Sequence, residues 1–208
     1  MSYRFRAEHD ESLEIGTLMP APISKSLWTR FEQYASAVVD VIGLERGIFH
    51  LEIILTDHGP EVVELNPRLM GGSLPILYER AYDFNIFHML IKIYLNGSIP
   101  QFPKISKKYS LSCFFGSFSD GTMPSSFDLS WLDEYSNFNP DLHWYVGANG
   151  SFEKLQSNFS YIGRFILSSE SISEAIKARD QILVKLENTL GFKITRPEKG
   201  IPPCLKIY

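Results

Sequence analysis

The stretch that decides the fold is Gly47–Ser73, which reads GIFHLEIILTDHGPEVVELNPRLMGGS. It contains two apolar runs, residues 47–56 and 60–66, joined by Asp57-His58-Gly59. Short strand-like runs separated by a turn that contains glycine are typical of a β-hairpin. Pro67 has no backbone N–H for a strand ladder and ends the second run. The sequence therefore predicts a hairpin followed by a glycine-rich loop.

A three-residue turn with glycine in the left-handed position determines which side chains of this hairpin face each other. The predicted cross-strand pairs are Thr56 with Pro60, Leu51 with Leu65, Ile53 with Val63, Glu52 with Glu64, and Ile54 with Val62. Side chains alternate between the two faces of a strand, so the leucine pair points to the core and the glutamate pair to the opposite face. Asn66 shares the face of Glu64, and His50 shares the face of Glu52.

Two glutamates directly across a hairpin repel each other. At ~5 Å and an effective dielectric constant of ~20 the repulsion is ~3 kcal/mol, so a compensating cation is expected. Mg²⁺ or Mn²⁺ prefers oxygen ligands, and Glu52, Glu64 and Asn66 supply them. Arg68 can hold a phosphate that bridges the metal ion. Gly71-Gly72-Ser73 leads into a predicted helix, whose free N–H groups can bind an anion.

Structural roles are the alternatives for these residues. A hairpin with glutamate on its solvent-facing side is common, and Glu64 could pair with Arg68 instead of a metal ion. His50 is more often a hydrogen-bonded strand residue than a ligand. An aromatic series at helical spacing is interpreted as core: Phe127, Trp131, Tyr135 and Phe138.

The rest of the sequence predicts an α+β protein with two domains. Apolar residues at helical spacing predict helices over 24–42, 73–82 and 85–95. Prolines and lysines make 98–108 the most linker-like segment, so the domains are predicted as residues 1–104 and 105–208. The second domain is predicted to contain strands at 109–118, 143–146 and 161–167. Its helix starts at the capping box Ser171–Glu174 and stops before Gly191.

The composition excludes several classes of protein. The 208 residues include 20 Lys and Arg against 24 Asp and Glu, a net charge of −4, which disfavours a nucleic-acid-binding surface. No apolar run approaches the ~20 residues of a membrane span, and no signal-like stretch opens the chain, so a cytoplasmic location and no membrane partner are expected. Cys113 and Cys204 lie far apart and outside metal-ligand spacing, which favours free thiols.

The hairpin motif resembles the second half of the ATP-grasp fold. The residues that carry the resemblance are Gly47-Ile48-Phe49-His50-Leu51-Glu52, Gly59-Pro60, Glu64-Leu65-Asn66-Pro67-Arg68 and Gly71-Gly72. Together with Glu14-Ile15-Gly16, Pro20-Ala21 and the following small domain, they resemble the branch of L-amino acid ligases. The resemblance implies the C-terminal half of an ATP-grasp domain, an antiparallel sheet with helices, followed by a small α+β domain.

The resemblance also implies an activity and a role for each matched residue. Family enzymes activate a carboxylate with ATP, and an amine attacks the acyl phosphate to give an amide. Glu52, Glu64 and Asn66 resemble ligands of the Mg²⁺ ions that bridge the ATP phosphates. Arg68 resembles the arginine that stabilises the transferred phosphoryl group. Gly71-Gly72-Ser73 resembles part of the carboxylate pocket.

Two features depart from the family pattern. Residues 16–19 lack the histidine that often precedes the Pro-Ala step, and no glycine-rich phosphate loop lies upstream of Glu52. The chain alone is therefore expected to offer metal and phosphate ligands without an adenine pocket, and to be inactive alone. A separately encoded N-terminal half or a homodimer is the expected partner, because Ile54, Val62 and segment 15–23 should be exposed.

Three functions remain open at this stage. The first is the C-terminal portion of an ATP-dependent carboxylate–amine ligase that acts on small carboxylates and amines. The second is a non-catalytic interaction module that retains the fold. The third is a metal-dependent hydrolase that uses His50, Glu52 and Glu64, although the histidine pairs favoured by zinc sites are missing from the sequence.

Overall fold

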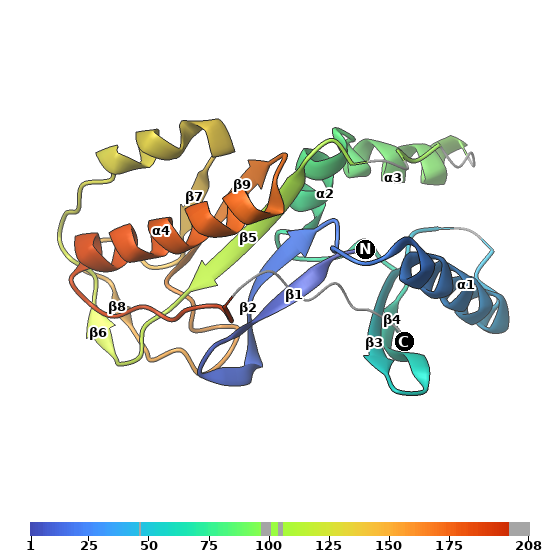
Figure 1. Cartoon of the computed structure of the whole chain (residues 1–208), viewed down its shortest axis with the longest axis horizontal. Coiled ribbons are helices and arrows are strands. Elements are labelled where there is room, and N and C mark those ends of the chain that lie inside the picture. The colour runs from blue at the N-terminus through green and yellow to red at the C-terminus, as the bar shows by residue number, and fades with distance from the viewer. Residues whose placement is uncertain (46, 97–100, 104–105, 200–208) are drawn as a thin grey trace. The chain divides into compact units, whose positions relative to one another are not determined.

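A computed structural model describes residues 1–45, 47–96, 101–103 and 106–199 (Figure 1). The described chain divides into two compact units. The first contains residues 1–21, 80–83 and 106–199, and the second contains the remaining described residues between 22 and 103. The predicted linker 98–108 lies partly outside the described residues.

The first unit is built on a five-stranded antiparallel sheet with one long helix on it. In spatial order the strands are β1 (Tyr3–Ala7), β2 (Asp10–Met19), β5 (Tyr109–Phe115), β9 (Gly163–Ser169) and β7 (Asp141–Trp144). Helix α4 (Ile172–Leu190) runs across one face of this sheet, as Figure 1 shows. The smaller elements are a 3-10 helix η1 (Ser130–Phe138) and a two-stranded sheet of β6 (Gly121–Thr122) and β8 (Ser151–Phe152).

The core of this unit follows the alternation of its strands. On β5, Leu111, Cys113 and Phe115 are fully buried in one cluster with the apolar face of α4. The helix begins where the sequence predicts, because the Ser171 hydroxyl accepts a hydrogen bond from the Glu174 N–H at 3.4 Å. The predicted core role of the aromatic series around Tyr135 is confirmed, since Tyr135 is buried in this cluster and the other three side chains pack against it.

The first two strands are a structural feature that the sequence analysis did not predict. β2 lies between β1 and β5, so Ile15, Leu18 and Met19 are at most 2% exposed. The expectation that segment 15–23 is an exposed edge is therefore wrong for these residues. The same pairing places residues 1–21 in one unit with the C-terminal half, whereas the predicted domain boundary groups them with residues up to 104.

The second unit holds the hairpin and three helices. Its elements are α1 (Lys25–Ile42), β3 (His50–Thr56), β4 (Gly59–Asn66), α2 (Leu74–Tyr82), whose last three residues belong to the first unit, and α3 (Ile86–Asn96). The predicted helices are thus confirmed. Ser24 caps α1, and Gly43 ends it in the left-handed conformation, with φ 68°. Ile86, Met89 and Ile93 bury one face of α3 against Tyr78 and residues that flank the hairpin.

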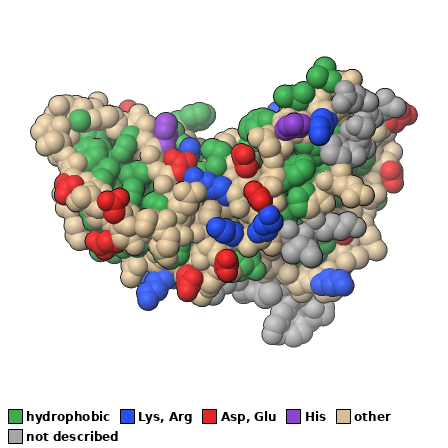
Figure 2. Space-filling view, turned by 90° about the horizontal axis from the view of Figure 1, so that it is seen from above, with side chains coloured by type: hydrophobic (Ala, Val, Ile, Leu, Met, Phe, Trp, Pro, Cys, Tyr) green, Lys and Arg blue, Asp and Glu red, His purple; other side chains and the backbone are tan. Residues whose placement is uncertain are grey.

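Charged side chains of both signs are interspersed on the face of the molecule seen in Figure 2. This distribution agrees with the small net charge of −4. It differs from the clustered lysines and arginines that are typical of a nucleic-acid-binding face. Among the described residues, no helix has both the length and the apolar character needed to cross a membrane.

Candidate functional site

The hairpin pairs Glu52 with Glu64, as predicted, but its turn is shorter than predicted and a β-bulge compensates for the difference. The turn has two residues, Asp57 and His58, so Thr56 pairs with Gly59 and not with Pro60. The Thr56 hydroxyl closes the turn: it donates to the Gly59 carbonyl at 3.0 Å and accepts from the His58 N–H at 3.1 Å. The predicted pairs near the turn are therefore each wrong by one residue.

A β-bulge then restores the predicted register. Ile53 pairs with Val62 while Glu52 pairs with Glu64, so Val63 is an extra residue on β4. A bulge inserts one residue into one strand and shifts all later pairs by one. Val63 is 61% exposed, and the bulge brings Glu64 directly opposite Glu52.

The two carboxylates have polar neighbours on the same face. Asn66 Nδ2 donates a hydrogen bond to Glu64 Oε1. His50 Nε2 lies 3.7 Å from Glu52 Oε1, and His50 itself pairs with Asn66 across the strands. The Glu52 side chain is 29% exposed, and Glu64 is exposed. Exposed like charges repel by less than ~1 kcal/mol, so the larger repulsion expected from the sequence is reduced by solvent screening.

Arg68 follows the hairpin and is directed away from Glu64. Its backbone N–H donates to the Asn66 carbonyl at 2.8 Å, and its Nη1 donates to the Leu69 carbonyl at 3.1 Å. Among the described residues the structure forms no Glu64–Arg68 ion pair. The alternative in which Arg68 neutralises Glu64 is therefore not what the chain adopts, and the exposed Arg68 guanidinium remains accessible to an anion.

The turn Gly71-Gly72-Ser73 lies beside this arginine and leads into α2. A Cβ atom at Gly71 would lie 3.8 Å from Arg68 Nη1. Gly72 has φ 61° with open space on its Cα, whereas Ser73 is only 5% exposed. The Leu77 N–H donates to the Ser73 carbonyl at 3.0 Å, which starts the helical hydrogen-bond pattern. The guanidinium and this helix start are therefore neighbours.

This donor set fits a hard divalent cation. Two carboxylates and one amide oxygen are the ligands from which Mg²⁺ is commonly held, with water and phosphate oxygens completing the coordination. No group of three or more His, Cys, Asp or Glu side chains with metal-binding geometry occurs among the described residues. His50, Glu52 and Glu64 therefore do not form the three-ligand centre that the hydrolase interpretation requires.

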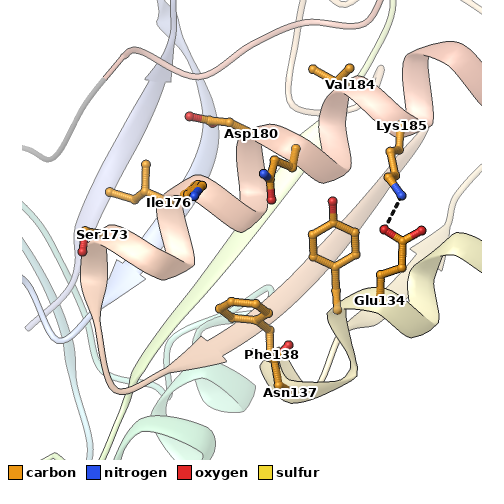
Figure 3. A pocket seen from close by; sticks show the side chains of 11 residues that line it. Glu134, Asn137, Phe138, Ser173, Ile176, Asp180, Val184 and Lys185 are labelled. Atoms are coloured by element: carbon orange, nitrogen blue, oxygen red, sulfur yellow. Dashed lines mark hydrogen bonds and ion pairs between the residues drawn. The ribbon is translucent and has the colours of Figure 1, made fainter.

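Two other features of the first unit do not add reactive groups. Burial raises the pKa of the Cys113 thiol to about 12, so this cysteine is a poor nucleophile. A groove of about 900 Å³ lies between η1 and α4 (Figure 3). Phe138, Ile176 and Val184 contribute to its lining, and an ion pair of 2.6 Å joins Glu134 to Lys185 beside them.

The predicted site residues are thus together in the second unit. Glu52, Glu64 and Asn66 share one face of the hairpin, and Arg68 adjoins the glycine turn. Sequence reasoning missed a separate cluster in the first unit, Arg80, Asp141 and Arg164. Its members are far apart in the chain, so no local motif could have predicted it.

No protein-family model matches the chain. Among curated proteins, the uncharacterized protein y4rH of Sinorhizobium fredii is 32% identical over 74 residues. The matched segment covers 36% of this chain and 16% of the length of y4rH. Dapdiamide A synthase of Enterobacter agglomerans is 33% identical over 48 residues, covering 23% of this chain and 11% of its own. The chain therefore matches only a small part of either curated relative.

The solved structures match most of the chain. Phosphoribosylglycinamide synthetase from Anaerococcus prevotii superposes with a TM-score of 0.70 at 16% identity, covering 96% of this chain and 49% of that one. L-amino acid ligase from Bacillus licheniformis superposes with a TM-score of 0.67 at 14% identity, covering 90% and 44%. The chain spans about half the length of these enzymes. It therefore has the fold that these two enzymes share, the ATP-grasp fold expected from the sequence, over about half of their length.

Proposed function

We propose that the chain is the metal- and phosphate-binding portion of an ATP-dependent carboxylate–amine ligase that acts through an acyl phosphate. The observation that carries the proposal is the direct pairing of Glu52 with Glu64 beside Asn66. A bulge is needed to produce this pairing, and opposed glutamates weaken a hairpin. A role in holding Mg²⁺ gives a reason for this arrangement.

Each residue has a distinct role in this proposal. Glu52, Glu64 and the Asn66 amide oxygen hold Mg²⁺, which when bound neutralises the phosphate charge of ATP. Arg68 moves from the Leu69 carbonyl to the γ-phosphoryl group of ATP as the substrate carboxylate displaces ADP. It then holds the acyl phosphate until the amine displaces inorganic phosphate and forms the amide. The N–H groups of the Gly71–Ser73 turn orient the substrate carboxylate. The carboxylate and amine substrates are inferred from the family resemblance. The name of one relative, Dapdiamide A synthase, is consistent with amide formation by that protein.

A competition experiment tests this function. The sequence predicts no adenine pocket in this chain, so nucleotide binding should depend on the phosphates alone. Mg²⁺-dependent ATP binding, measured by calorimetry, should then be no tighter than about millimolar. Tripolyphosphate should bind as tightly as ATP and prevent ATP from binding, whereas adenosine should not compete with ATP. Arg68→Gln should lower the affinity for both ATP and tripolyphosphate on the order of tenfold, because one charge-assisted hydrogen bond is lost.

The matched control for Arg68 is Arg30→Gln, which removes an exposed arginine on α1 and should leave binding unchanged. Micromolar ATP binding with adenosine as a competitor would mean that the chain contains its own nucleotide pocket. No polyphosphate binding at all would instead favour the non-catalytic interaction module.

We also propose that α3 is covered by a partner chain. Its face opposite the core exposes Phe87, Ile91, Tyr94 and Leu95 by 49–79%. Because the other face of α3 is already buried, the helix is apolar on both sides, which is typical of a fully buried helix. On the hairpin, Ile54 and Val62 are 56% and 39% exposed, as expected from the sequence.

Light scattering of the purified chain should therefore detect a dimer, or a complex with a separately encoded N-terminal half when the two are co-expressed. Ile91→Asp should shift the equilibrium toward monomer, because the charge would be buried at the interface. The control is Val184→Asp, which alters a similarly exposed apolar residue on α4 in the other unit. A monomer at high concentration, without a co-purifying chain, would contradict the proposal.

A further inference from the structure

Two arginines of the first unit converge on one carboxylate oxygen. Arg164 Nη1 lies 3.6 Å and Arg80 Nη2 lies 3.8 Å from Asp141 Oδ2. Both distances exceed those of charge-assisted N–H···O hydrogen bonds, about 2.7–2.9 Å. Arg80 makes its close contact elsewhere, since its Nη1 donates to the Asn139 carbonyl at 2.7 Å. Asp141 Oδ2 thus lies between two guanidinium groups, and the distance to each of these two nitrogens is longer than a hydrogen bond.

The cluster lies on the sheet face opposite α4. Arg164 on β9 alternates with Phe165, which faces α4 in the core, and it pairs across the strands with His143 on β7. Asp141 is two residues before His143, so both share the face of Arg164. β7 is the edge strand of the sheet, and His143 is exposed. A ligand can therefore approach this end of the sheet from solvent.

Arg164 is the more buried of the two arginines. Its side chain is 14% exposed, and its Nη1 is buried without a hydrogen-bond partner. A buried donor that makes no hydrogen bond is costly, because folding removes it from water without replacing the bond. A negatively charged acceptor from a ligand would supply the hydrogen bond that this donor lacks.

We propose that Arg80, Arg164 and Asp141 form a binding site for a small oxyanion, the carboxylate or phosphate group of a ligand. The paired oxygens of such a group match the fork of a guanidinium, which binds carboxylate and phosphate in two parallel hydrogen bonds. His143, across the strands from Arg164, is placed to add a third donor. Asp141 holds the two arginines together when the ligand is absent and competes with it for them.

Charge substitutions of opposite sign test this site. Inorganic phosphate and acetate, each titrated at constant ionic strength into the full chain, should produce saturable shifts of arginine side-chain N–H signals. Asp141→Asn should tighten binding on the order of tenfold, because it removes the competing acceptor. Arg164→Gln should abolish the saturable shift of the Arg80 side-chain N–H signals, whatever phosphate does at Arg68. A purely structural ion-pair cluster would lose stability in both variants, and its arginine signals would show no saturable shift with either anion.

A replacement variant, a control variant and the comparison of the two anions distinguish the possible results. If Arg164→Gln does not fold, Arg80→Gln is the replacement, because Arg80 lies at the end of α2 and is 20% exposed. Arg30→Gln, in the other unit, should change nothing. Saturation by phosphate alone identifies a phosphate group, and saturation by both probes identifies a general oxyanion site. Absence of saturable binding in the wild type and in Asp141→Asn overturns the proposal, independently of metal binding at Glu64.

Discussion

Replacing Glu64 by glutamine is expected to abolish Mn²⁺ binding while leaving the hairpin intact or slightly more stable. Glutamine keeps the shape of the side chain and removes its charge, so the pairing with Glu52 persists without repulsion. Relief of an exposed like-charge pair is worth less than ~1 kcal/mol, whereas loss of one of two anionic ligands removes a main source of cation affinity. Metal binding and stability should therefore change in opposite directions.

Electron paramagnetic resonance of free Mn²⁺ during titration, combined with thermal unfolding, measures both effects. The matched control is Glu61→Gln on the same strand. Glu61 pairs with Ile54, so it has no opposing carboxylate, and its Oε1 lies 3.1 Å from the Thr56 hydroxyl oxygen. Glu61→Gln should bind Mn²⁺ as the wild type does. Retention of binding by Glu64→Gln, or its loss in Glu61→Gln as well, would place the metal elsewhere.

The hairpin shows how far sequence reasoning reaches. The register deduced from the turn correctly predicted that Glu52 and Glu64 face each other. The turn length was wrong, since Gly59 with φ 118° begins β4 and is not the last turn residue. The bulge at Val63 compensates for that difference. A bulge depends on local hydrogen bonding, which a two-residue periodicity does not encode.

Strands β1 and β2, which were not predicted, show a different limit of prediction from sequence. Tyr3, Phe5 and Ala7 alternate with Arg4 and Arg6, a period of two that could have predicted β1. The charged residues that open β2 concealed the second strand. Its pairing with β5 joins residues almost a hundred positions apart, and nothing local in the sequence specifies that contact. The arginine cluster around Asp141 escaped prediction for the same reason.

The pairing of β2 with β5 leads to the second large effect, at Gly16. We expect Gly16→Ala to destabilise the chain by about 3 kcal/mol, the upper part of the range for overpacked cores. A Cβ at this position would lie 2.7 Å from the Ser112 carbonyl oxygen and 3.3 Å from Phe5 Cδ2. The first of these atoms is backbone in the neighbouring strand and cannot move without breaking the sheet pairing. The glycine is therefore required by the close approach of two strands.

Thermal or urea unfolding measures this effect, with Gly147→Ala as the matched control. A Cβ at Gly147 meets no atom within 4 Å, and its backbone conformation is open to other residues. The control should be neutral or stabilised by up to about 1 kcal/mol, because alanine restricts the unfolded chain. For a chain of this size the loss at Gly16 corresponds to a midpoint lower by about 10 °C. Equal midpoints for the two variants would mean that β2 does not pack between β1 and β5 in solution.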